Sequence, residues 1–339
     1  MQNLEIALSY LAAGLCVLPA NVQRKFAALS QWKEYQNRLP TGTELRSWFG
    51  NGHDGLCIVA GKVSGNLEML DFDLEAELFD RWRDIVAETS PNLLEQLVIE
   101  RSQSGGCHVI YRCQGEVCKS IKLAQRKITV PAGDDVVICG KTYKPRRDKQ
   151  GNWLVIITLI ETRGEGGLFL CAPSPGYTLS QGEFIHLPVL TTSQRDILLE
   201  SAWALNEHVP DIVGETSVPS SPDSGLRPGD DFNSRGDIRA ILQAHGWKCV
   251  QSGDNERWRR PGKTDGWSAT FNGKYFYVFT SNASPFEPQT PYSPFVVYAM
   301  LEHDGDYGRA AGSLSQKGFD YIHKYKYVID FAVSFGLSE

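Results

Sequence analysis

The 339-residue chain lacks any uninterrupted apolar run long enough to cross a bilayer, and its first five residues, Met1 to Glu5, lack the basic start of a signal peptide. We therefore expect a cytoplasmic protein with no membrane partner. Excess positive charge is also missing, because the net charge is −6, so only a local surface could bind nucleic acid. An apolar fraction of 42% is sufficient for packed cores, and the length suggests two domains.

Zinc-knuckle and phosphate-loop motifs are missing as well. None of the eight cysteines forms a Cys-x-x-Cys pair, so we do not expect zinc, although Cys113, Cys118 and Cys139 leave a looser zinc site open. The segment Gly262-Lys263-Thr264 resembles the end of a phosphate loop, but Arg257 stands where the first glycine should be. The sequence therefore predicts no ATPase or helicase in this chain.

Carboxylates stand at the ends of two apolar segments. Leu67 to Asp73 is typical of a strand, and Asp71 and Asp73 then share one face because side chains alternate along a strand. Leu154 to Glu161 is a second apolar run that ends in an acid. Each acid alone is also typical of a solvated strand end. Together they predict a site for a cation, and hard oxygen ligands favour Mg²⁺ or Mn²⁺.

A glycine turn joined to a strand predicts an anion site between these two segments. Glycines let backbone N–H groups approach an anion, and His108 and Arg112 share one face of the strand that follows the turn. The alternative is a hairpin whose histidine is satisfied by a neighbouring backbone group. The residues expected to bind a triphosphate are Ser104, Gly105, Gly106, His108, Arg112, Lys122 and Arg163.

The order and spacing of four segments carry a resemblance to a known family. They are Gly61-Lys62-Val63-Ser64-Gly65 leading into Leu70-Asp71-Phe72-Asp73, then Ser104-Gly105-Gly106-Cys107-His108, then Ile160-Glu161-Thr162-Arg163-Gly164-Glu165-Gly166-Gly167, then Ala172-Pro173-Ser174. Over about the first two hundred residues the chain resembles the bifunctional DNA primase/polymerase (prim-pol) family of the archaeo-eukaryotic primase superfamily, found in phage and plasmid replication proteins.

This resemblance implies a catalytic core built on an RRM-like sheet. It implies that Asp71, Asp73 and Glu161 bind two divalent ions, Mg²⁺ or Mn²⁺, and that His108 contacts the phosphates of the incoming nucleotide. The third acid is often Asp in relatives, so Glu161 is a departure from the family pattern. The catalytic residues expected are therefore Asp71, Asp73, His108 and Glu161.

The function implied is that of a nucleotidyltransferase in DNA replication, a DNA primase and DNA-directed DNA polymerase. Its partners would be a single-stranded DNA template, a primer strand and nucleoside triphosphates, with a replicative helicase as a candidate protein partner. Two alternatives stay open: a non-catalytic replication-initiation or single-stranded-DNA-binding module that retains the acids, and a metal-dependent phosphodiesterase.

The expected fold class is α+β, with a second, smaller α+β accessory domain after the core. We expect a prim-pol catalytic domain at 1–210, a Ser/Pro-rich linker at 211–230 and an accessory primase C-terminal domain at 231–339. The helices expected are one that begins at Leu4 and others at Thr41–Phe49, Ser193–Glu207, Asp237–His245 and Pro294–His303.

Two basic segments are candidates for contacting DNA. The first contributes Lys141, Lys144, Arg146 and Arg147, and its alternative is a solvated hairpin with ordinary surface charges. In the second, Arg257-Trp258-Arg259-Arg260, an aromatic residue lies between basic ones, which suits stacking on unpaired bases. Its alternative is a hairpin with Trp258 in the core and solvated arginines.

Overall fold

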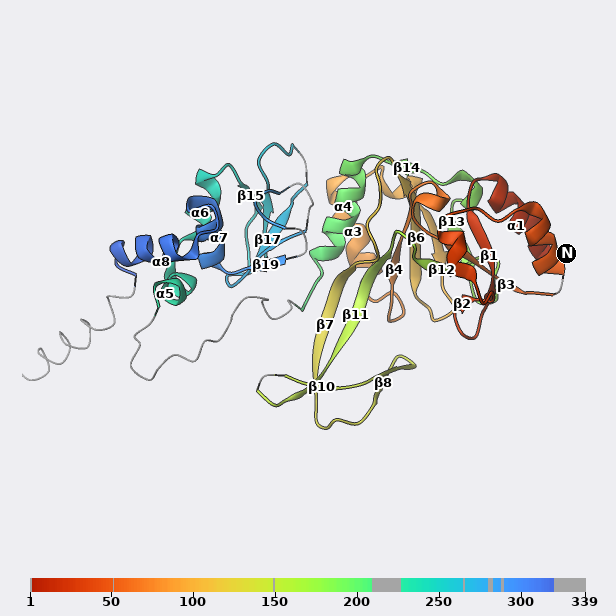
Figure 1. Cartoon of the computed structure of the whole chain (residues 1–339), viewed down its shortest axis with the longest axis horizontal. Coiled ribbons are helices and arrows are strands. Elements are labelled where there is room, and N and C mark those ends of the chain that lie inside the picture. The colour runs from red at the N-terminus through yellow and green to blue at the C-terminus, as the bar shows by residue number, and fades with distance from the viewer. Residues whose placement is uncertain are drawn as a thin grey trace, which may run out of the picture. The chain divides into compact units, whose positions relative to one another are not determined.

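The computed structural model describes residues 2–50, 52–148, 150–208, 227–264, 266–279, 283–287 and 290–319. Its internal contacts divide the chain into two compact units, Met1–His208 and Val209–Glu339 (Figure 1). Both units combine helices with largely antiparallel sheets, as expected for an α+β protein. No helix among these residues is long and apolar enough to span a bilayer.

Helices were expected at most of the places where the structure has them. In the first unit they are α1 (Gln2–Ala12), α2 (Gly42–Gly50), α3 (Phe79–Thr89) and α4 (Thr192–Trp203), with 3₁₀ turns η1 (Trp32–Gln36), η2 (Lys62–Ser64), η3 (Leu94–Gln96) and η4 (Phe184–His186). In the second unit they are α5 (Pro228–Arg235), α6 (Ile238–Ala244), α7 (Pro294–Glu302) and α8 (Tyr307–Gln316).

The ends of these helices have local causes. The Thr41 hydroxyl accepts a hydrogen bond from the Glu44 N–H, and the Glu44 carboxylate accepts one from the Thr41 N–H, which caps α2 as predicted. Helix α4 ends at Trp203, before the predicted Glu207, and the Glu207 carboxylate pairs with Arg126 outside the helix. Of the predicted linker 211–230, residues up to 226 lie outside the described residues. Pro228 begins α5, so the end of that range is helical instead.

Two sheets build the first unit. The first has the strand order β12-β3-β1-β2, with β1 (Cys16–Asn21), β2 (Phe26–Ala27), β3 (Gly55–Val59) and β12 (Leu168–Cys171). Residues Ala7 and Tyr10 of α1 share the core of this sheet. Strands β1 and β3 are buried along almost their whole length, which accounts for their continuous apolar sequences.

The second sheet has the order β10-β11-β4-β6-β5-β13, and β7 pairs with β11 while β14 pairs with β6. Its strands are β4 (Leu67–Phe72), β5 (Val98–Arg101), β6 (Cys107–Cys113), β7 (Lys122–Val130), β10 (Arg146–Arg147), β11 (Trp153–Arg163), β13 (Thr178–Gln181) and β14 (Val189–Leu190). The ribbon of β7 and β11 extends beyond the sheet, and a hairpin of β8 (Val136–Ile138) and β9 (Lys141–Tyr143) lies near its end (Figure 1).

Strand β4 has a different core on each of its faces. Met69 belongs to the core shared with the first sheet, whereas Phe72 packs against Trp82 of α3 on the other face, with ring centroids 5.0 Å apart. The Trp82 indole N–H donates to the Leu198 carbonyl, which ties α3 to α4. Because both faces are packed, the strand cannot slip by one residue without exchanging its two sets of side chains.

The second unit contains a five-stranded antiparallel sheet. Its order is β15-β16-β17-β18-β19, with β15 (Lys248–Gln251), β16 (Glu256–Arg259), β17 (Ala269–Phe271), β18 (Phe276–Val278) and β19 (Thr290–Tyr292). Trp258 is 0% exposed in a core that includes Leu242 of α6 and Val297 of α7. The prediction that Trp258 stacks on DNA bases is therefore wrong, and the alternative of a core tryptophan holds.

The arginines around Trp258 have intramolecular partners. Arg257 lies over the Trp267 ring at 4.3 Å. Arg259 donates to the carbonyls of Thr264 and Gly266, and Arg260 donates to the Pro261 carbonyl. This segment is therefore a structural hairpin rather than an alternating row of free aromatic and basic side chains.

We predict that Trp258→Ala lowers the free energy of unfolding of the second unit by about 3–5 kcal/mol, because it leaves a large cavity in the core. Hydrogen exchange across residues 227–319 of the full chain measures this loss. Tyr307→Ala, which removes a side chain that is 52% exposed, should cost less than about 1 kcal/mol. A Trp258→Ala protein that is as stable as the wild type but binds DNA poorly would contradict this account.

Candidate active site

The strand register of the second sheet aligns four polar residues in one row. Glu161 of β11 lies opposite Asp71 of β4, Asp71 lies opposite His108 of β6, and His108 lies opposite Glu100 of β5. Directly opposite residues of antiparallel strands point to the same face of a sheet. All four side chains therefore lie on the face that carries Met69, toward the first sheet.

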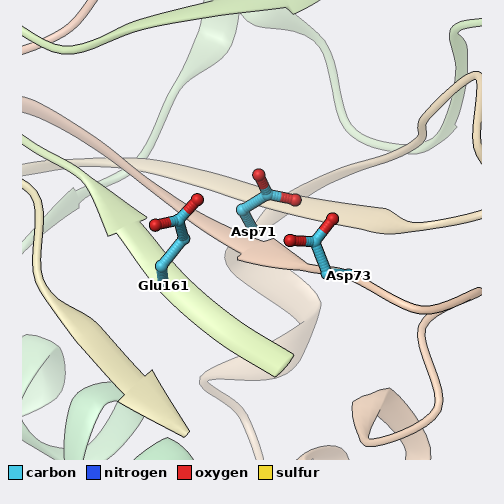
Figure 2. Close-up of side chains that lie close together, drawn as sticks. All are labelled: Asp71, Asp73 and Glu161. Atoms are coloured by element: carbon cyan, nitrogen blue, oxygen red, sulfur yellow. The ribbon is translucent and has the colours of Figure 1, made fainter. Parts of the chain in front are cut away.

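Three carboxylates gather at one end of this row. Asp73 follows the last residue of β4, and its N–H donates to the Leu159 carbonyl of β11. Oxygens of Asp71, Asp73 and Glu161 lie within 4.8 Å of one another, and Figure 2 shows the three carboxylates around a common space. No other group of three or more potential ligands of this kind occurs among the described residues.

The chemistry of this donor set fits the divalent ions expected from the sequence. Its carboxylates provide only oxygen donors, which Mg²⁺ and Mn²⁺ prefer. The side chains of Asp71, Asp73 and Glu161 are 15%, 23% and 16% exposed, so each keeps some access to solvent. The three residues could thus hold cations that still bind water or a substrate oxygen.

The electrostatics of the site also favour a cation. Burial raises the pKa of the Asp73 carboxyl, and the charge of Asp71 raises it further against the opposing effect of Lys141. Burial likewise raises the pKa of Glu161, while Arg163 opposes the shift. Because the carboxylates are costly to keep charged together, positive charge between them would stabilise the site.

Two basic side chains already contact these acids. Lys141 from β9 lies 3.3 Å from Asp73. Arg163 lies 2.5 Å from Glu161 and 3.6 Å from Asp71. Lys141 was predicted to face nucleic acid. The sequence could not show its contact with Asp73, because that contact depends on how the β8–β9 hairpin folds back toward the site.

His108 is held between two carboxylates. Its Nδ1 lies 2.7 Å from Glu100 Oε1, and its Nε2 lies 3.6 Å from Asp71 Oδ1. Burial lowers the pKa of His108, but the hydrogen bond to Glu100 and the charge of Asp71 outweigh this effect and raise the pKa above its usual value. The partner of the histidine is thus a buried carboxylate rather than a backbone group. Sequence reasoning missed Glu100, since its role depends on the β5–β6 register.

The predicted glycine turn lies against the end of β4. Gly105 has a φ of +78°, which favours glycine, and a Cβ atom at Gly106 would lie 2.6 Å from the Phe72 carbonyl oxygen. The Ser104 hydroxyl accepts a hydrogen bond from Lys25 Nζ at 3.3 Å. The turn can therefore pack against the end of β4 only because Gly106 carries no side chain.

A pocket of about 400 Å³ opens beside the acids. Its volume lies in the range of small-molecule sites. The side chains that line it combine acids, bases and rings, and they include Asp71, Asp73, His108, Lys25, Ser104, Lys141, Arg163, Phe169 and Tyr177. Lys25, Phe169 and Tyr177 had no motif in the sequence that would have identified them.

Four of the predicted phosphate ligands do not line this pocket: Gly105, Gly106, Arg112 and Lys122. Arg112 is at the other end of β6, opposite Leu67, where its guanidinium donates to the carbonyls of Ala13 and Ser64. It shares a sheet face with His108 as predicted, but its donors bind backbone. Lys122 lies opposite Glu161 in the β7–β11 register and does not line the pocket.

The remaining predicted residues are spread over the unit. Lys144, Arg146 and Arg147 are exposed near the end of the β7–β11 ribbon, and Arg147 lies 4.7 Å over the Trp153 ring. Of the cysteines considered for zinc, Cys113 is buried while Cys118 and Cys139 are exposed. These three do not form a ligand cluster in the part of the chain that the structure describes.

We predict that Mn²⁺ stabilises the folded protein through the three acids. At about 100 times its dissociation constant, Mn²⁺ should add about 2.7 kcal/mol to the free energy of unfolding, measured by denaturant titration with and without the ion. The double variant Asp71→Asn/Asp73→Asn should lose this gain.

A control for the loss of two charges is Asp80→Asn/Asp84→Asn on the exposed side of α3, which should keep the full gain. Equal stabilisation of both double variants by Mn²⁺ would place the ion elsewhere.

Comparison with known protein families shows a match to one of them. The N-terminal domain of bifunctional DNA primase/polymerase (Prim-Pol) matches residues 7–191, which is more than half of the chain and includes all four residues of the cross-strand row and Asp73. No curated protein matches the chain. The resemblance inferred from the motifs is thereby confirmed, and the chain belongs to the bifunctional DNA primase/polymerase family.

Proposed function

We propose that the chain is a DNA primase and DNA polymerase that joins nucleoside triphosphates along a single-stranded DNA template. The observation that carries the proposal is the cluster of Asp71, Asp73 and Glu161, with oxygens within 4.8 Å of one another inside the family-matched region. The strand order β11-β4-β6-β5, with α3 between β4 and β5, supports the RRM-like core that the family implies.

Asp71, Asp73 and Glu161 would hold two divalent ions, Mg²⁺ or Mn²⁺. Such ions, when bound, lower the pKa of the attacking 3′-hydroxyl and neutralise charge on the departing pyrophosphate. Glu161 in place of the more common Asp has a longer side chain, yet its oxygen still reaches the same cluster as the two aspartates.

The basic groups around the pocket would bind the triphosphate of the incoming nucleotide. His108 Nε2 faces the acids, and Arg163, Lys141 and Lys25 line the same pocket. Donors fixed near developing phosphate charge stabilise a transition state more than flexible ones do. Ser104 lines the same pocket and extends this donor set. The Gly105 N–H already donates to the Ser102 carbonyl, Gly106 does not line the pocket, and Arg112 is committed to backbone carbonyls, so these three are left out of it.

The exposed end of the β7–β11 ribbon would bind the DNA strands. Lys144, Arg146 and Arg147 are exposed there, and Lys141 of the adjoining hairpin reaches Asp73. Positive side chains of this kind contact phosphates independently of base sequence. In this proposal the second unit, predicted at 231–339, serves as an accessory domain, and a replicative helicase would act as a separate protein.

We predict that the wild-type protein incorporates labelled nucleotides on single-stranded templates with Mg²⁺ or Mn²⁺, and that Asp71→Asn/Asp73→Asn lowers the rate by at least about 10³-fold because charge stabilisation at the phosphates is lost. Product on unprimed template would establish priming.

Asp80→Asn/Asp84→Asn serves as the charge-matched control and should keep full activity. Template binding without incorporation would favour the non-catalytic module, and release of nucleotides from labelled DNA without triphosphates would favour a phosphodiesterase.

We predict that the triple variant Lys144→Gln/Arg146→Gln/Arg147→Gln weakens binding of single-stranded DNA. Loss of three phosphate contacts should reduce the slope of log K against log salt by about 2. Fluorescence anisotropy at several salt concentrations measures both quantities. The variant Lys33→Gln/Arg46→Gln/Arg81→Gln removes the same charge from exposed positions elsewhere in the unit and should keep the wild-type slope. Equal slopes for the two triple variants would contradict a DNA-binding ribbon.

A further inference from the structure

Glu100 is a fully buried carboxylate beside the site, with an exposed fraction of 0%. A buried charge is costly unless it is hydrogen bonded on its oxygens. Both oxygens of Glu100 have a partner: Oε1 lies 2.7 Å from His108 Nδ1, and Oε2 accepts a hydrogen bond from the Ala172 N–H at 2.8 Å. The carboxylate is therefore fixed by the backbone at one oxygen and by the histidine at the other.

The ring of His108 is confined by this contact and by its neighbours. Phe169 lies nearly perpendicular to it at 83°, with centroids 6.0 Å apart, and the Tyr177 centroid lies at 5.9 Å. With Nδ1 held at Glu100, Nε2 is the nitrogen turned toward Asp71 and the pocket. A free imidazole could turn either nitrogen toward the pocket, whereas this one presents a single nitrogen.

We propose that Glu100 is a positioning residue for the nucleotide: it fixes the ring of His108 so that Nε2 meets the phosphates of the incoming triphosphate. The proposal rests on the proposed function, because it assigns Nε2 to a phosphate. Partners that orient a functional histidine from behind typically contribute 10–100-fold to affinity or activity at metal sites, and we expect about the lower end of that range here.

Glutamine is the informative substitution because it keeps the size of the side chain. A carboxylate accepts hydrogen bonds at both ends, but the amide of Gln offers one acceptor oxygen and one NH₂ donor. Glu100→Gln can accept a hydrogen bond at its oxygen from Ala172 or from a protonated Nδ1 of His108, but its NH₂ end can accept from neither. The substitution loosens the ring of His108 without opening a cavity.

Glu68 of β4 provides a matched control in the same sheet. It is also 0% exposed, but it lies on the opposite face of the sheet, where Arg195 donates to its two oxygens at 2.6 and 2.8 Å and the Tyr111 hydroxyl donates at 3.0 Å. Glu68→Gln thus perturbs a buried carboxylate that accepts hydrogen bonds at both oxygens, and it does so without contacting His108. This control shows how much of any effect of Glu100→Gln comes from lower protein stability rather than from a displaced His108 ring.

The kinetic test compares nucleotide incorporation by the wild type, Glu100→Gln, His108→Ala and the double variant. Glu100→Gln should raise the KM for the nucleotide about 10-fold with a smaller change in kcat, and it should add nothing once His108 is absent. Glu68→Gln should keep the wild-type KM. An unchanged KM in Glu100→Gln, the same KM increase in Glu68→Gln, or a full effect of Glu100→Gln in the His108→Ala background would overturn the proposal.

A second test does not depend on activity. In protein with ¹⁵N-labelled histidine, the ring signals absent from His108→Ala identify His108, and its Nδ1 proton should be hydrogen bonded and slow to exchange. Glu100→Gln should shift these signals and speed the exchange, whereas Glu68→Gln should not. Unchanged signals in Glu100→Gln would overturn the positioning role. Failure of the wild type to incorporate nucleotides would instead count against the proposed function.

Discussion

The register of β4 between β11 and β6 is the constraint on which the site depends. It aligns Glu161, Asp71 and His108 across three strands and extends the row to Glu100 on a fourth. A slip of one residue would turn Asp71 away from the other three and toward α3 and α4. The two different cores that pack against Met69 and Phe72 prevent that slip, so the hydrophobic packing of the strand also fixes the positions of the acids.

Charge balance accounts for the other residues of the site. Burial raises the pKa values of Asp73 and Glu161, and repulsion among the three carboxylates raises them further. Lys141 and Arg163 offset part of this repulsion through direct ion pairs. These basic groups come from the two segments that flank the pocket, so the same side chains that balance the acids stand where the charge of a triphosphate would enter.

Local sequence patterns were sufficient to predict the three strands that carry the site, because alternation and apolar runs act over a few residues. The strand predicted from Leu67, the strand predicted after the glycine turn and the apolar run from Leu154 correspond to β4, β6 and β11. The same reasoning placed Arg112 on the face of His108 but could not show that Ala13 and Ser64 occupy its guanidinium. Glu100 and Lys25 were not predicted as site residues, and Lys141 was predicted to contact DNA. Strand pairing places Glu100 beside His108, and loop folding brings Lys25 and Lys141 to the pocket, so no local sequence pattern identifies these roles. The sequence left open whether Trp258 stacks on DNA bases or packs in the core. Its burial against helices that are distant in the sequence shows that it is a core residue.

We propose that Asp71, Asp73 and Glu161 bind the ions of a nucleotidyl transfer site and that His108 lies beside the phosphates. This proposal can be tested by anomalous diffraction from crystals grown with Mn²⁺ and a non-hydrolysable deoxynucleoside triphosphate. We expect two manganese peaks at the three carboxylates and a phosphate oxygen within hydrogen-bond distance of His108 Nε2. Manganese bound elsewhere, or a triphosphate that leaves the pocket between Lys25 and Lys141 empty, would contradict it.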